Sequence, residues 1–208
     1  MGDLHLVLPV LNFSTLNTGI LIMMHQSAKE GNIADLEFYL DNLRFDKNPE
    51  SRIKDGHNGL TPMHLAATNG HLEVVQLIKS KIDIANPANG KGWTILHSAA
   101  LNGQLEIIKE ISNNLEDKNP AAKGYASRTP LHLAAVSGHL EVVKYYYKIM
   151  PDNIGILDSR GYNSLHLAVY AKQLLAVEFL ADLIALDIKT ERTQETALLI
   201  AYKRGHEG

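Results

Sequence analysis

Residues 129–143 read TPLHLAAVSGHLEVV, and this stretch decides the fold because close copies of it recur along the chain. Residues 61–75 read TPMHLAATNGHLEVV, and residues 94–108 read TILHSAALNGQLEII. Three weaker copies begin at Asn163, at Thr196 and, in degenerate form, near Ile22. From residue 61 onward the copies start 33, 35, 34 and 33 residues apart. A fixed period of this length predicts a solenoid of stacked repeats, each of which buries its apolar face against its neighbours.

Each copy carries the start and stop signals of two short helices. Thr129 can cap a helix by accepting a backbone N–H, and Pro130 suits the first helical turn, where a missing N–H donor costs nothing. Gly138 can then end the first helix in a left-handed conformation. An apolar stripe from Leu140 predicts a second helix, and at least one tyrosine of residues 145–147 must face the stack. Because such short helices are unstable alone, stacking must supply most of the stability.

This pattern resembles the ankyrin repeat family from residue 22 to the end of the chain. The resemblance implies an all-α fold, in which each unit has a β-turn finger and two antiparallel helices. It implies a solenoid of about six units, the last incomplete, starting near residues 22, 61, 94, 129, 163 and 196. Residues 1–21 lie outside the repeats and are predicted to form an N-terminal capping segment.

Composition narrows the function. The chain has 208 residues, with 20 Lys and Arg against 23 Asp and Glu, and no cysteine. A net charge of −3 argues against a nucleic-acid partner, which usually requires a basic excess. The apolar runs near the N-terminus are too short to span a bilayer, so no membrane insertion is expected. The absence of cysteine excludes disulfides and thiolate metal sites and fits a cytoplasmic location, or the host cytoplasm for a secreted effector.

The ten histidines could suggest metal binding or acid–base chemistry, but eight of them occupy two positions of the repeat. Five share the motif position of His132, and three follow the motif glycine as His139 does. We interpret them as structural residues that bond backbone groups of the neighbouring unit. Metal or catalytic use is the alternative. No zinc, phosphate-loop or nucleophile-elbow motif is present, so neither a cofactor nor enzymatic activity is expected.

Positions that differ between units are candidates for recognition. In ankyrin-like units these lie on the finger before the motif threonine and near the end of the first helix, on the concave side. Trp, Tyr and Arg dominate binding hot spots. The predicted partner-binding residues are therefore Trp93, Arg128, Tyr162, Tyr170, Leu101, Asn102, Val136, Ser137, Lys91 and Arg160. The alternative is that Trp93 and Tyr162 only pack against the next finger.

Three departures from the repeat predict altered turns. Lys172 and Gln173 replace the Gly-His pair of the fifth unit, Gln194 replaces the finger glycine of the sixth, and Ser127 replaces that of the fourth. After Thr196 the sequence contains only one further helix signal. We therefore expect the polypeptide to continue beyond residue 208, with more repeats or another domain.

These observations favour a non-catalytic module, monomeric on its own, that binds another protein or peptide on the concave surface of its fingers and first helices. The alternative is a regulatory or targeting arm of a larger enzyme, channel or bacterial effector whose activity lies elsewhere. Ankyrin-like folds carry many unrelated binding functions, so fold alone does not name the partner.

Overall fold

In a computed structural model, the structure describes residues 13–42, 59–82, 86–113, 115–123 and 125–205. The described chain is helical, with one isolated β-bridge between Ala88 and Thr94. Its elements are α1 (Phe13–Glu30), α2 (Ile33–Asn42), α3 (Pro62–Asn69), α4 (Leu72–Lys81), α5 (Ile95–Leu101), α6 (Leu105–Ser112), η1 (Tyr125–Ser127), α7 (Pro130–Ser137), α8 (Leu140–Ile149), η2 (Pro151–Asn153), α9 (Ser164–Tyr170), α10 (Leu174–Ala181) and α11 (Ala197–Lys203).

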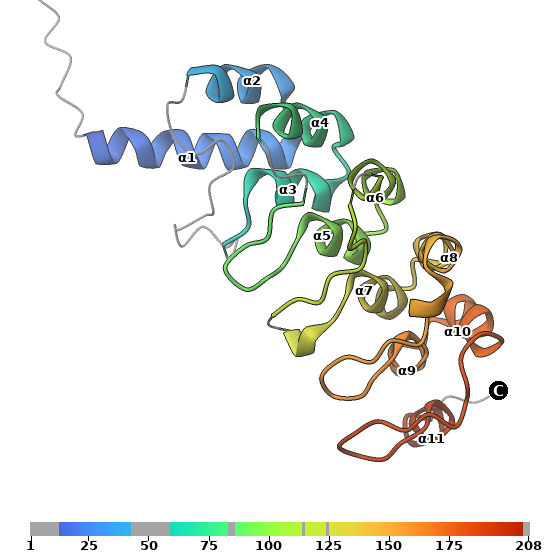
Figure 1. The fold of residues 1–208 in the computed structure, drawn as a ribbon. Helices are drawn as coiled ribbons and strands as arrows, with labels where there is room; N and C mark the ends of the chain where they lie inside the picture. Colours follow the sequence, from blue (N-terminus) through green and yellow to red (C-terminus); the bar gives the residue numbers. More distant parts are fainter. Residues whose placement is uncertain (1–12, 43–58, 83–85, 114, 124, 206–208) are drawn as a thin grey trace, which may run out of the picture.

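The helices form two rows in an elongated stack (Figure 1). The first helices of successive units, α1, α3, α5, α7, α9 and α11, pack one on the next. The second helices, α2, α4, α6, α8 and α10, form the other row, and long finger loops extend from the first row on its far side (Figure 1). The all-α solenoid expected from the repeat is confirmed.

Helix α1 runs without a break from Phe13 to Glu30, so the boundary expected between residues 21 and 22 falls inside one helix. Its C-terminal half occupies the first-helix position of the degenerate unit and packs against α3. Nε2 of His25 lies 3.2 Å from the carbonyl oxygen of Leu60. Residues 1–12 of the predicted capping segment lie outside the described residues, and its capping role remains a prediction.

The predicted helix caps are present. Thr61 has extended backbone before α3 and accepts the N–H of His64, while His64 accepts the N–H of Thr61 through Nδ1. Thr94, Thr129 and Asn163 form the same reciprocal cap with their own histidines. Gly70 ends α3 in the left-handed region, at φ 82°. Local chemistry therefore starts the first helices of the second to fifth units, and Gly70 ends α3.

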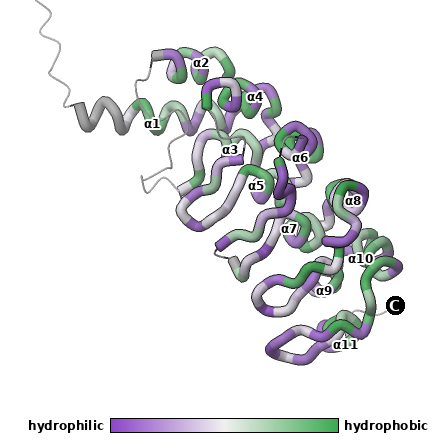
Figure 2. Tube along the Cα trace, in the orientation of Figure 1, coloured by the Kyte–Doolittle hydropathy of each residue, from purple (hydrophilic) through white to green (hydrophobic). Residues whose placement is uncertain are grey.

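The core lies between the two rows of helices, where the apolar faces meet (Figure 2). Small paired alanines such as Ala66 and Ala67 are fully buried and let first helices pack closely. Branched residues of the second helices, such as Val75 and Ile108, fill the space between the rows. Tyr146 is buried, as expected for one of the three consecutive tyrosines.

The departures from the repeat alter the turns less than predicted. Lys172 and Gln194 keep the left-handed conformation of the glycines they replace, at φ 60° and 53°. Gln173 donates through Nε2 to the carbonyl oxygen of Val136, in the same way that His139 bonds Leu101. The fourth finger differs in conformation, because two consecutive residues, Ala126 and Ser127, are left-handed there. Contacts between units therefore fix the backbone even where the sequence departs from the pattern.

Candidate partner-binding groove

The motif histidines are structural, and they hold the backbone of the finger residues. The N–H of Thr61 donates to Nδ1 of His64, so the imidazole proton lies on Nε2, which donates to the carbonyl oxygen of Trp93 at 2.8 Å. His97 and His132 bond the carbonyl oxygens of Arg128 and Tyr162 in the same way. The repeated histidine of one unit therefore positions the variable residue of the next.

These imidazoles are neutral. Burial lowers the pKa of His64 and of His97 to about 4, against the weaker opposing effect of their backbone hydrogen bonds. Burial also lowers the pKa of His132 and of His166. Within the described ranges, no group of three His, Asp or Glu side chains could hold a metal ion. The structural interpretation of the histidines is the one that this geometry supports.

The finger residue of the third unit, Trp93, is anchored to its own unit. Its Nε1–H donates to Oγ of Ser98 at 2.9 Å, and its ring lies 5.2 Å from the ring of His97. The backbone N–H groups of Trp93 and Lys91 both donate to Oδ1 of Asn89. Trp93 is half-buried, so one face of the indole packs while the rest remains accessible.

The predicted residues at the ends of α5 and α7 are neutral. Leu101 is exposed, and Asn102 bonds back to the carbonyl oxygen of Ser98. Val136 and Ser137 are half-buried at the end of α7. Together with exposed Lys91 on the third finger, they lie outside the hollow described next.

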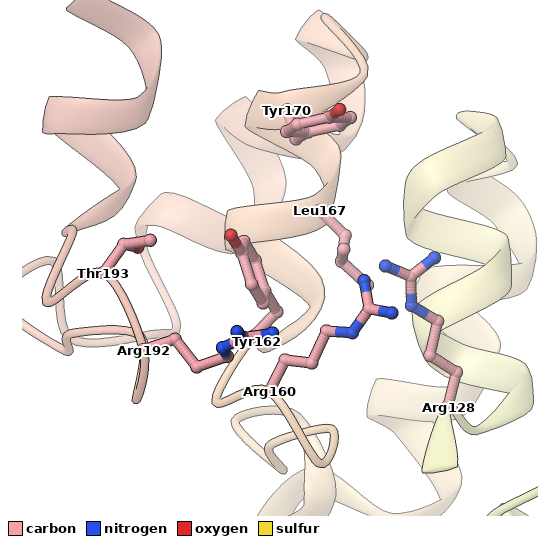
Figure 3. A pocket seen from close by; sticks show the side chains of 7 residues that line it. All are labelled: Arg128, Arg160, Tyr162, Leu167, Tyr170, Arg192 and Thr193. Atoms are coloured by element: carbon pink, nitrogen blue, oxygen red, sulfur yellow. The ribbon is translucent and has the colours of Figure 1, made fainter. Parts of the chain in front are cut away.

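Four of the ten predicted residues come together in one groove of about 600 Å³. It crosses three consecutive units and is lined by Arg128, Arg160, Tyr162, Leu167, Tyr170, Arg192 and Thr193 (Figure 3). Arg128 comes from the fourth finger, Arg160 and Tyr162 from the fifth, and Arg192 and Thr193 from the sixth. Leu167 and Tyr170 lie on α9.

One buried carboxylate organises the groove. Oδ1 of Asp158 accepts the N–H groups of Arg160 and Tyr162 at 2.8 and 3.0 Å. Oδ2 lies 3.3 Å from Nε of Arg128, and the Asp158 side chain is fully buried. A charged acceptor strengthens these bonds, so a single residue fixes three groove residues from two fingers. The sequence carried one signal for this role: Asp158 lies four residues before Tyr162, just as Asn89 lies four residues before Trp93 in the third finger.

The groove is basic although the chain as a whole is acidic. Among the described residues, no carboxylate lies within ion-pair distance of Arg160 or Arg192. Beside the groove, the guanidinium of Arg204 lies over the Tyr170 ring at 3.9 Å. This arrangement can hold an anion next to aromatic surface.

The contribution of the sixth finger could not be read from the repeat. In the fifth finger the backbone N–H of Asp158 donates to the carbonyl oxygen of Tyr162, four residues later. In the sixth finger the backbone N–H of Thr190 donates to the carbonyl oxygen of Glu195, five residues later. The sixth finger therefore has one extra residue. That insertion shifts Arg192 and Thr193 out of the positions that the shorter fingers would assign.

Comparison with known families agrees with this architecture. A family model described as ankyrin repeats, in three copies, matches residues 24–123, 114–192 and 131–208. The chain therefore belongs to the ankyrin repeat family, whose members generally act as protein–protein interaction modules. The matching models include no catalytic domain. A search of curated proteins finds no match to the chain. In the part of the chain that the structure describes, no helix combines the length and apolar character that crossing a bilayer requires.

Proposed function

We propose that this chain is a non-catalytic interaction module that binds a partner protein or peptide on its finger and first-helix face, with the groove of units four to six as the centre of contact. The observation that carries the proposal is the convergence of two tyrosines and three arginines from three units on one hollow. Tyr offers a large contact area with few rotatable bonds, Arg offers a planar charged group with several N–H donors, and both are enriched in binding hot spots.

The scaffold suits this role because its backbone is already ordered. Histidine and Asp158 bonds hold the finger backbone, so a partner would meet a preformed surface and little ordering entropy would be lost on binding. A partner that buries about 800 Å² per side would cover roughly three units. The neutral stretch formed by Leu101, Asn102, Val136 and Ser137 would then extend the contact toward Lys91 and Trp93. We also propose a monomeric state and a cytoplasmic location, which the absence of cysteine fits.

The test is an affinity measurement on a captured partner. The whole chain is used to isolate binding proteins, and the dissociation constant is then measured for Trp93→Ala, Tyr162→Ala and the control Glu141→Ala, which lies exposed on α8. We expect each aromatic variant to lose about 2 kcal/mol or more and the control to bind like the parent chain. Melting curves confirm that the variants remain folded. Unchanged affinity in both aromatic variants would remove the proposed surface.

A further inference from the structure

We propose that the groove binds an acidic peptide segment, whose carboxylate side chain lies between Arg128 and Arg160; this inference rests on the proposed function. The guanidinium groups of these two arginines point toward each other across the groove (Figure 3). Two like charges that face one another repel, and an anion between them turns that repulsion into two attractive interactions. Arginine is also the side chain best suited to bind a carboxylate through two parallel hydrogen bonds.

The nearby acidic residues of the chain do not fill this role. Asp158 lies beneath the groove, with both oxygens engaged by the finger backbone and by Nε of Arg128. Glu195 pairs with Lys203 at 2.6 Å. Glu191 is exposed on the sixth finger and is not part of the groove lining. The charge of Arg160 and Arg192 is therefore available to a ligand.

The dimensions of the groove suit a short extended peptide. It crosses three units, and first helices that pack about 10 Å apart give a length of roughly 20 Å. An extended chain advances about 3.3 Å per residue, so the groove accommodates about six residues. Leu167, Tyr162 and Tyr170 offer apolar and aromatic contact beside the charges. We therefore expect an apolar or aromatic side chain next to the acidic one.

The distribution of charge favours a peptide over a nucleic acid. A nucleic-acid strand carries one phosphate per roughly 3.4 Å and needs a continuous basic track. Three arginines gather in the groove, whereas the neighbouring predicted surface at Leu101, Asn102, Val136 and Ser137 is uncharged. A segment with one or two carboxylates matches the groove, whereas most phosphates of a longer strand would lack a partner.

The first experiment is a selection from a library of random peptides of about nine residues on the whole chain. We expect the enriched peptides to contain Asp or Glu beside an apolar or aromatic residue. The tightest peptide is then labelled and titrated by fluorescence anisotropy, together with a version in which Asn and Gln replace Asp and Glu. The neutral version should bind at least about tenfold more weakly, which corresponds to about 1.4 kcal/mol. Enriched peptides without acidic residues, or no enrichment, would overturn the proposal.

Charge-reversed variants locate the site. The double variant Arg160→Glu/Arg192→Glu should bind the selected peptide at least about tenfold more weakly. The control Lys109→Glu/Lys144→Glu changes the net charge equally but lies on second helices, and it should bind like the parent chain. Binding should also weaken as salt is raised, since exposed charges are screened over about 10 Å. Equal affinities of the two double variants would overturn the proposal.

Two further probes test the ligand class. A uridine oligonucleotide of about ten residues that binds more tightly than any peptide, and loses binding in Arg160→Glu/Arg192→Glu, would contradict a peptide ligand. A phosphoserine version that binds at least about tenfold more tightly than the acidic peptide would contradict the carboxylate assignment.

The captured partner separates this inference from the proposed function. If its affinity falls in Tyr162→Ala but not in Arg160→Glu/Arg192→Glu, the interaction surface stands and the acidic ligand is wrong. If it falls in none of Trp93→Ala, Tyr162→Ala and Arg160→Glu/Arg192→Glu, both proposals fail.

Discussion

The Nε atom of Arg128 lies 3.3 Å from Oδ2 of Asp158, whose side chain is fully buried, so the fourth and fifth fingers are joined by an ion pair beneath the groove. The same carboxylate accepts two backbone N–H groups of its own finger. The geometry of the groove therefore depends on a residue that a partner would not touch.

Two substitutions of Asp158 should separate the contribution of its charge to stability from that of its hydrogen bonds to the finger turn. Asp158→Asn keeps an oxygen for the N–H groups of Arg160 and Tyr162, as Asn89 does in the third finger, and should lower the free energy of unfolding by about 1 kcal/mol. Asp158→Ala leaves both N–H groups and Arg128 without this acceptor, and should cost about 3 kcal/mol. Denaturant unfolding measures both. Equal losses would contradict the role assigned to the turn.

The buried histidines predict acid sensitivity. The pKa of His64 and of His97 is about 4 in the folded chain and about 6.5 when unfolded, so the unfolded state binds more protons between these values. Their contribution to stability is complete above pH 6.5 and is lost as the pH falls toward 4, by about 1.4 kcal/mol per pH unit for each histidine. Denaturant unfolding at several pH values from 7.5 to about 4.5 measures the slope; ordinary carboxylates titrate mainly below this range.

The variant His97→Gln provides the control for this slope. It should be less stable than the parent chain at neutral pH, because the bond to Arg128 is disturbed, yet its stability should decline less steeply with acid. A free energy of unfolding that stays constant between about pH 6.5 and 5 would show that the motif histidines do not titrate as proposed.

Removing the hydroxyl groups of two neighbouring tyrosines should change the free energy of unfolding in opposite directions. The hydroxyl of Tyr146 is buried and has no hydrogen-bond partner among the described residues. Tyr146→Phe should therefore raise the free energy of unfolding by about 1 kcal/mol, because an unsatisfied polar group is removed. The Tyr145 hydroxyl lies 2.8 Å from Oγ of buried Ser112, so Tyr145→Phe should lower it by about 1 kcal/mol. Thermal unfolding of both variants tests this contrast. A Tyr146→Phe variant that is less stable than the parent chain would contradict it.

The left-handed turn at Lys172 should be improved by glycine. Lys172 has φ 60°, a conformation that disfavours side chains with a Cβ, and it is exposed. Lys172→Gly should stabilise the chain by up to about 1 kcal/mol, whereas Lys172→Gln should change little. Denaturant midpoints compare the two. A glycine variant no more stable than the glutamine variant would mean that the turn is not strained.

The sequence predicted the features that form within one unit or between two adjacent units. The cap between Thr61 and His64 lies within one unit, and the bond from His64 to Trp93 joins adjacent units. Because both recur with the repeat, their pattern was visible in the chain. Even at Lys172, where glycine is missing, the packing of adjacent units keeps the turn.

The groove was only partly predictable because it depends on three fingers at once. Arg128, Arg160, Tyr162 and Tyr170 stood out as residue types at variable positions. Arg192 did not, since the turn of the sixth finger is one residue longer than that of the fifth and departs from the repeat. Asp158 did not either, because its ion pair with Arg128 forms between two fingers and is not visible in the repeat.

The central claim, that the finger and first-helix face holds the partner, is tested most directly by site-specific photo-crosslinking. A photoreactive phenylalanine derivative replaces either Tyr170, in the groove, or Lys144, which is exposed on α8. Each variant is mixed with the captured partner and irradiated. We predict a crosslinked product from position 170 and none from position 144. A product from position 144 alone would contradict the account.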